Sequence, residues 1–218
     1  AEGAGRGVAM GYWINAGMQS SATLNVIADG HVSILTGSPD IGGSRASMAL
    51  MASEVLGIPF EQIHPQVAAT DAVGHTDVTG GSRTTLATGQ AVIQAAEECV
   101  AEMCRRAAAE WEVEPGVVTW SQGAAHYGDQ SLTFEDLAGR AGAMGGPLTF
   151  STSLTSTSTA PGFGVHICDA EVDKETGRTT ITRYTAIQDA GKAIHPDYVE
   201  GQMQGGAVQG IGWALNEE

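Results

Sequence analysis

The sequence is poor in positive charge. Only 10 of its 218 residues are lysine or arginine, against 25 aspartates and glutamates, so the formal net charge is −15. Proteins that bind a bare phosphate backbone neutralise it with clustered lysine and arginine. Here these residues are few and spread thinly along the chain, which argues against nucleic acid as a partner.

Long apolar runs and paired cysteines are also missing. No run of 18 or more apolar residues occurs, so we expect no membrane span. The three cysteines, Cys99, Cys104 and Cys168, form no CxxC pair, which favours reduced or buried thiols over a zinc site or a disulfide framework. We therefore expect a cytoplasmic protein, with the periplasm as the alternative.

The two ends of the sequence look cut. The chain starts at Ala1 without a methionine or an apolar leader segment, and it stops at Glu218 straight after an apolar run. A secretory signal would show an apolar stretch near the start. We therefore expect the chain to be an excised portion of a longer subunit.

The remaining composition is that of a folded protein. Hydrophobic residues make up 42% and charged residues 16%, which excludes a disordered acidic tail. Glycine is abundant, with 30 residues, about twice the usual share of roughly 7%.

Hydrophobic periodicity predicts alternating strands and helices. The expected strands or extended segments are residues 21–27, 31–36, 63–69, 117–120, 124–127, 148–160, 163–173 and 179–186, and the expected helices are 45–56, 84–112, 133–138 and 196–215. Asp29-Gly30 is a hairpin turn signal, and Thr133 is a candidate helix cap.

This order of elements predicts an α+β fold with antiparallel hairpins and segregated helices. It consists of a ββαβα-type lobe followed by ββα. We expect residues 1–218 to be part of a single domain, with two sub-lobes at about 1–147 and 148–218. Five glycines in the last helix each cost about 1 kcal/mol, so we expect a backbone, a helix or a ligand to approach it closely.

Three glycine-rich stretches are candidate binding loops: residues 42–44, 79–85 and 204–210. The first two precede predicted helices, where unpaired backbone N–H groups favour phosphate or other anions. The alternative is purely structural, with Ser44 and Ser82 capping the two helices.

Common catalytic and metal signatures are absent from the sequence. It holds no GxxxxGK[ST], no GxSxG, no HExxH and no GxGxxG leading into a helix. Asp71, His75 and Asp77 lie close together in the sequence and could hold a metal, but a solvated loop is the favoured interpretation.

Several segments together resemble the molybdopterin-binding subunit of the xanthine dehydrogenase / aldehyde oxidase family. They follow the family's order over nearly the whole chain: residues 40–44, 52–59, 79–85 with 89–91, 171–177, 189–196 and 199–212. The resemblance implies a molybdenum-cofactor-binding domain. In this family the pterin dithiolene holds the molybdenum, so no metal ligands are expected from the protein.

By resemblance, the cofactor contacts lie in the three glycine-rich stretches. They are Gly42, Gly43, Ser44, Gly80, Gly81, Ser82, Arg83, Thr84 and Gln209. The family's first loop usually reads Gly-Gln-Gly, whereas this chain has Gly42-Gly43-Ser44 and lacks the amide.

The resemblance also implies the reaction and its partners. The expected function is oxidation of an aldehyde or N-heterocycle with water as oxygen source, by molybdopterin in its cytosine dinucleotide form. FAD and 2Fe–2S clusters are expected on partner subunits or domains, together with the rest of the subunit and a small-molecule substrate.

One element of the family's catalytic machinery is missing. The family's general base is the glutamate of a Gly-x-Gly-Glu motif, and this sequence contains no Gly-Glu dipeptide. We therefore expect no catalytic residue here and an inactive fragment, truncated before that glutamate. The alternative function is a non-catalytic scaffold that kept the fold and lost the cofactor.

Overall fold

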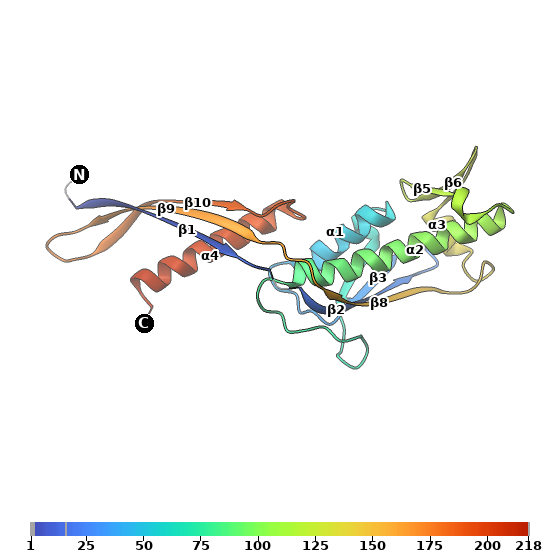
Figure 1. The fold of residues 1–218 in the computed structure, drawn as a ribbon, viewed down its shortest axis with the longest axis horizontal. Helices are drawn as coiled ribbons and strands as arrows, with labels where there is room; N and C mark the ends of the chain where they lie inside the picture. The colour runs from blue at the N-terminus through green and yellow to red at the C-terminus, as the bar shows by residue number, and fades with distance from the viewer. Residues whose placement is uncertain (1–2, 16, 218) are drawn as a thin grey trace. The chain divides into compact units, whose positions relative to one another are not determined.

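The computed structural model describes residues 3–15 and 17–217. The chain forms two compact units (Figure 1). Unit 1 contains the described parts of 1–15 and 159–218, and unit 2 those of 16–158. The expected sub-lobes within one domain stay a prediction. The expectation about the chain ends rests partly on Ala1, Glu2 and Glu218, which lie outside the described residues.

Unit 2 is built on a four-stranded sheet of order β4-β3-β2-β8. Its strands are β2 (Met18–Val26), β3 (Val32–Thr36), β4 (Ile63–Val67) and β8 (Leu148–Ser156). The β2–β3 hairpin turns at Asp29-Gly30 as predicted, with Gly30 at φ 85°. The Asp29 carboxylate accepts the His31 N–H at 3.0 Å, which closes the turn.

One strand pair departs from the expected antiparallel pattern. β4 runs parallel to β3, with Val32 opposite Ile63, because helix α1 (Ser44–Leu56) crosses between them and returns the chain to the same end of the sheet. The other pairs are antiparallel, so the α+β class is confirmed with this one correction.

The long helix packs with α1 on one face of the sheet (Figure 1). It begins with a π-helical turn, Thr84–Thr88, and continues as α2, Gly89–Glu110, close to the predicted 84–112. A Cβ at Gly89 would lie 2.6 Å from Sδ of Met51, so glycine lets the two helices approach. Small and apolar side chains of α2, such as Ala91, Ala95 and Met103, fill the core.

A small three-stranded sheet completes unit 2. It consists of β5 (Thr119–Ser121), β6 (Ala124–Tyr127) and β7 (Gln130–Thr133). β7 was not predicted, because its four residues are too short to show periodicity. Helix α3 (Phe134–Gly139) follows, and Thr133 caps it as predicted, accepting the Asp136 N–H at 3.1 Å. Two 3-10 turns, Phe60–Gln62 and Pro115–Val117, lie between the larger elements.

Unit 1 is a three-stranded antiparallel sheet with one helix. Its elements are β1 (Ala4–Trp13), β9 (Gly162–Val172), β10 (Thr179–Asp189) and α4 (Pro196–Leu215). The β9–β10 hairpin and α4 match the prediction. β1 was missed, because its glycines hide the strand pattern, but it pairs with β9 from Ala4–Glu171 to Trp13–Gly162.

Four of the five glycines of α4 have no packing explanation in the described residues, whereas a Cβ at Gly212 would meet the side chain of Glu217. A Cβ at Gly201, Gly205, Gly206 or Gly210 would meet no described atom within 4 Å. The expected close neighbour is therefore not supplied by this part of the chain. Among the described helices, none combines the length and the apolar character needed to cross a bilayer.

A cluster of charges on α2 makes unit 2 sensitive to acid. Arg105 Nε donates to the Glu102 carboxylate at 2.6 Å, and Arg106 Nε donates to it at 2.7 Å. These hydrogen bonds, that of Arg105 first, lower the Glu102 pKa to about 2. Arg106 also donates to Gly146 O at 2.7 Å, which ties the helix to the segment before β8.

We expect Glu102→Gln to weaken unit 2 by about 2 kcal/mol at pH 7. Because folding lowers this pKa, the stabilisation is present above the unfolded value of about 4.3 and is lost as the pH falls toward 2. Urea unfolding between pH 7 and pH 2 should show the two proteins converging. Glu97→Gln, at an exposed position of the same helix, is the control, and an unchanged gap at pH 2 would contradict the assignment.

Candidate functional site

The first glycine loop leads into α1 through two left-handed glycines. Gly42 and Gly43 have φ values of 61° and 79°, and Gly43 occupies the cap position of α1. The capping role considered for Ser44 is therefore wrong. The Ser44 hydroxyl instead accepts the Ile41 N–H at 3.3 Å, within the loop.

An ion pair fixes the same loop to the first turn of α1. The Asp40 carboxylate accepts the Arg45 backbone N–H at 3.0 Å and Arg45 Nε at 2.8 Å. The backbone hydrogen bond from Arg45, followed by that from its side chain, lowers the Asp40 pKa. The loop therefore holds its shape while Gly42 stays exposed.

The second glycine loop enters its helix in the same way. Gly81 and Ser82 have φ values of 68° and 60°, and Arg83 rather than Ser82 holds the cap position before Thr84. A Cβ at Gly80 or Gly81 would meet no described atom within 4 Å. The loop thus presents open backbone at the start of the longest helix.

Two hydroxyls of this second loop are buried without a partner. Thr84 is only 8% exposed, and its Oγ1 finds no hydrogen-bond partner among the described residues. The same holds for Oγ1 of Thr79. An unpaired buried hydroxyl lowers the stability of the folded state by about 1–3 kcal/mol. A ligand that forms a hydrogen bond with either oxygen would remove this cost.

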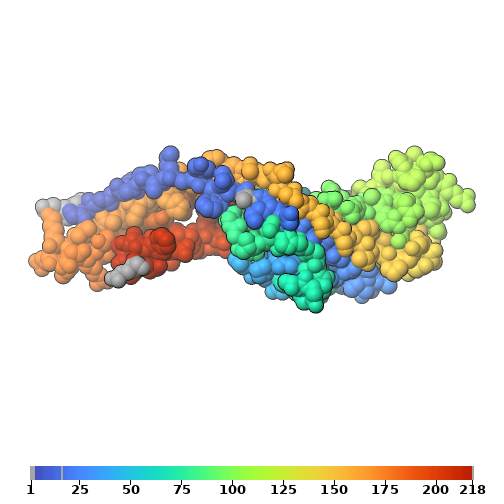
Figure 2. Space-filling view, turned by 60° about the horizontal axis from the view of Figure 1, so that its bottom comes forward, coloured from blue at the N-terminus to red at the C-terminus, as the bar shows by residue number. Residues whose placement is uncertain are grey.

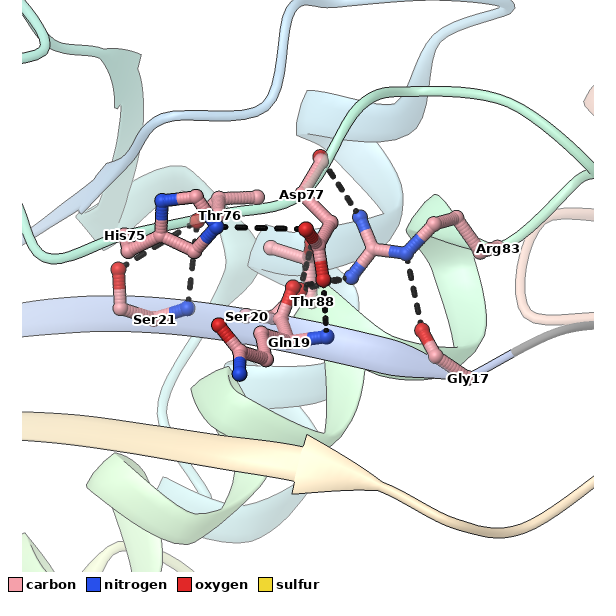
Figure 3. Close-up of polar contacts among 9 residues, drawn as sticks. All are labelled: Gly17, Gln19, Ser20, Ser21, His75, Thr76, Asp77, Arg83 and Thr88. Carbon is pink, nitrogen blue, oxygen red and sulfur yellow. Dashed lines mark hydrogen bonds and ion pairs between the residues drawn. The ribbon is translucent and has the colours of Figure 1, made fainter.

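The guanidinium of Arg83 is hydrogen-bonded within the chain, and the contact of Arg83 with a cofactor stays a prediction. Its side chain is 0% exposed. Its Nε donates to Gly17 O at 2.9 Å, and its two terminal nitrogens donate to Asp77 O at 3.1 Å and Gln19 O at 2.5 Å. Burial lowers the guanidinium pKa. The side chain is therefore committed to the chain itself (Figure 3).

The segment before the second loop is fastened along β2 (Figure 3). The Asp77 carboxylate accepts the Gln19 N–H at 2.7 Å, and the Asp77 N–H donates to Gln19 O at 3.1 Å. The Gln19 hydrogen bond, ahead of that from His75, lowers the Asp77 pKa. Residues 68–82 nevertheless lie at the surface, in green in Figure 2.

The favoured interpretation of Asp71, His75 and Asp77 as a loop without a metal stays a prediction. Asp77 is occupied by the backbone of β2 and by His75, whose Nε2 lies 3.3 Å from Oδ1. In the described part of the chain, no three His, Cys, Asp or Glu side chains converge as a metal site.

Gln209 belongs to a different unit from the other candidate residues. It is exposed on α4 of unit 1, whereas the other eight belong to unit 2. Its amide makes no hydrogen bond among the described residues. Its contact with a cofactor stays a prediction.

The polar residues that support these loops could not be identified from the sequence. The buried hydroxyl of Thr88 forms hydrogen bonds with the buried hydroxyls of Ser20 and Ser38. They come from a strand, a loop and a helix, so no local spacing connects them. One signal could have identified them. A serine or threonine at a predicted buried position of a strand or helix needs a hydrogen-bond partner.

The comparison with known proteins decides the family. The family described as molybdopterin cofactor-binding domain matches residues 1–218. The chain belongs to this family. The resemblance found in the sequence is thereby confirmed.

Three curated relatives are similar to this chain over part of their length. The molybdopterin cofactor-binding domain is 32% identical over 203 residues to xanthine dehydrogenase of Drosophila subobscura, covering 92% of this chain and 15% of that protein. It is 30% identical to the nicotine 6-hydroxylase large subunit of Paenarthrobacter nicotinovorans, covering 91% and 26%. It is 30% identical to the carbon monoxide dehydrogenase large chain of Hydrogenophaga pseudoflava, covering 81% and 23%. The chain therefore spans about a quarter or less of these relatives.

Solved structures share the fold. A reconstituted CO dehydrogenase from Oligotropha carboxidovorans superposes with a TM-score of 0.86 at 24% identity, covering 93% of this chain and 28% of that one. Quinoline 2-oxidoreductase from Pseudomonas putida 86 gives 0.83 at 22% identity, covering 97% and 30%. At these identities the likeness establishes the fold alone.

Proposed function

We propose that this domain forms part of the protein shell around molybdopterin in a molybdenum hydroxylase-type oxidoreductase. The observation that carries the proposal is the unpaired, buried Oγ1 of Thr84 at the start of a long helix. A helix start with free backbone N–H groups suits a phosphate group. Molybdopterin carries such a group, so the donor set fits it.

The residues that would hold the cofactor are those of the two loops, with Gln209 of α4 as a further amide contact. Gly42, Gly43, Gly80 and Gly81 carry no side chain and would let the cofactor come close to the loop backbone. Thr84 would offer its unpaired hydroxyl, with Ser44 and Ser82 as further candidate contacts. Arg83 contributes through its backbone and by holding the loop, because its guanidinium is already committed.

The bound cofactor would supply two-electron oxidation at molybdenum, while the protein supplies binding and orientation. The proposed substrate is an aldehyde or N-heterocycle, with water as the oxygen source. We further propose the cytosine dinucleotide form of the pterin, and FAD and 2Fe–2S clusters on partner subunits or domains. The proposed compartment is the cytoplasm.

The general base is proposed to lie outside these 218 residues, because they contain no Gly-Glu dipeptide. On this proposal the domain is inactive alone and works with the rest of its subunit. Its own part is to bind and orient the cofactor.

Thr84→Val should separate cofactor binding from folding, because its two effects have opposite signs. Without molybdopterin, removal of the unpaired hydroxyl should raise stability by about 1 kcal/mol or more. With molybdopterin, the loss of a hydrogen bond to a charged group should weaken retention about tenfold or more. Thermal unfolding of the cofactor-free protein and pterin content of the complete subunit measure the two effects.

Thr85→Val is the matched control, since Thr85 is exposed in the same helical turn. It should change neither quantity appreciably. Unchanged pterin content in Thr84→Val would contradict the proposal and favour the alternative, a scaffold domain that kept the fold without the cofactor. The feature that favours this alternative is Gly43, which replaces the family's glutamine and so removes an amide.

A further inference from the structure

A buried chain of hydrogen bonds connects the two glycine loops of unit 2. A terminal guanidinium N–H of Arg83 donates to Ser20 Oγ at 2.6 Å. Ser20 Oγ lies 3.1 Å from Thr88 Oγ1, and Thr88 Oγ1 lies 2.9 Å from Ser38 Oγ. All four side chains are buried. Arg83 belongs to the second loop, and Ser38 lies in the segment between β3 and α1 that leads into the first loop. The series of hydrogen bonds therefore connects the second loop to the approach of the first.

The guanidinium fixes the direction of the first hydrogen bond. It can only donate, so Ser20 accepts from Arg83. One arrangement of the remaining protons has Ser20 donating to Thr88 and Thr88 donating to Ser38. In this arrangement Ser20 and Thr88 each accept one hydrogen bond and donate one, and hydrogen bonds linked in series strengthen one another in a low-dielectric interior.

The charge of the Asp77 carboxylate favours the buried cation, but the hydrogen bonds of Arg83 point to a positioning role. The hydrogen bonds of Arg83 go to three carbonyl oxygens and one hydroxyl, and burying a cation without a bonded carboxylate is costly. These acceptors lie at the start of β2 or just before it, and in the segment before the second loop. A planar fork of fixed donors fits such a set, whereas a lysine ammonium does not.

We propose that Arg83 is a positioning residue that, through Ser20, Thr88 and Ser38, holds both glycine loops in one joint conformation. The loops would then be set relative to each other before a cofactor arrives. This inference rests on the proposed function for its significance. The coupling itself can be measured without any cofactor.

The test is amide hydrogen exchange in the whole protein, produced without molybdopterin. The amides of Gln19 and Asp77 report the attachment to β2 of the segment before the second loop, because each of the two residues accepts the other's N–H. The amides of Ile41 and Arg45 report the first loop, because they donate to Ser44 Oγ and Asp40 Oδ1.

Thr88→Val keeps the shape of the side chain and removes the central hydroxyl. We expect exchange at both reporter pairs to accelerate about tenfold through local opening, while Ile34 and Leu35 in β3 keep their rates. Thr85→Val, in the same helical turn, should leave every reporter unchanged. Equal acceleration throughout the sheet would overturn the proposal, since it would show a general loss of stability.

Ser38→Ala is the milder second variant. It removes the last hydroxyl of the hydrogen-bond series, on the side of the first loop. We expect amide exchange at Gln19 and Asp77, next to the second loop, to accelerate by about the same factor. Acceleration confined to Ile41 and Arg45 would show that each loop is held independently, and would overturn the proposal. Since no molybdopterin is present, this failure is distinct from unchanged pterin content in Thr84→Val, which bears on the proposed function.

Discussion

Leu24→Ala is expected to destabilise unit 2 by about 2–5 kcal/mol, the usual range for a large buried side chain cut to alanine. Leu24 is 1% exposed and lies on β2 between Ile34 of β3 and Phe150 of β8. Because β2 has a strand on either side, the surrounding side chains have little freedom to collapse into the space. Urea unfolding of the protein, with amide exchange at β2 to assign the change to unit 2, measures the effect.

Ile27→Ala removes a side chain of the same size just after the same strand. Ile27 is 48% exposed, so little of its surface leaves water on folding and the expected loss is about 1 kcal/mol or less. Comparable losses for the two variants would show that the sheet of unit 2 is not the stability core described above.

Elements with a strong local pattern were predictable from the sequence. The β2–β3 hairpin has strict alternation around Asp29-Gly30, and α4 has helical spacing from Pro196 to Leu215; both have the predicted form. β1 was not predictable in this way, because Gly5, Gly7 and Gly11 remove the alternation on which the prediction depends. Its place as a strand is set by pairing with β9, which is distant in sequence.

The direction of β4 and the role of Arg83 illustrate a second limit. Periodicity predicts a strand but not whether it runs parallel to its neighbour, which here depends on the crossover through α1. Similarly, the resemblance to the family marks Arg83 as part of a cofactor loop. Only the folded chain brings Gly17, Gln19 and Asp77 around its guanidinium, because these acceptors come from separate segments.

The candidate site shows the same division between local and non-local information. The turns at Gly42–Gly43 and at Gly81 follow from the glycines themselves, which adopt left-handed conformations that other residues avoid. The lack of a partner for Thr84 Oγ1 depends on every atom packed around it. The loops were therefore predictable as loops, whereas the atom that most clearly points to a ligand was not.

Gly123→Ala is expected to destabilise unit 2 by about 2–4 kcal/mol, through two separate causes. Gly123 has a φ of 69°, and its Cβ would lie 2.6 Å from Gly57 O and 3.3 Å from Cγ2 of Ile58. Gly57 ends α1 with a φ of 71°, so two backbones meet here without side chains. Trp120 Nε1 donates to Leu56 O at 3.0 Å beside this contact, and a shift of the turn would strain that bond as well.

Gly128→Ala separates the two causes. Gly128 has a comparable φ of 57°, but its Cβ would meet no described atom within 4 Å, so only the left-handed strain of about 1–2 kcal/mol remains. Urea unfolding of both variants should therefore show a gap of about 1 kcal/mol or more, the part due to overpacking. If the free energy of unfolding falls equally in both variants, the small sheet is not tightly packed against the end of α1. The Gly57–Gly123 contact would then not be what joins β5 and β6 to the core.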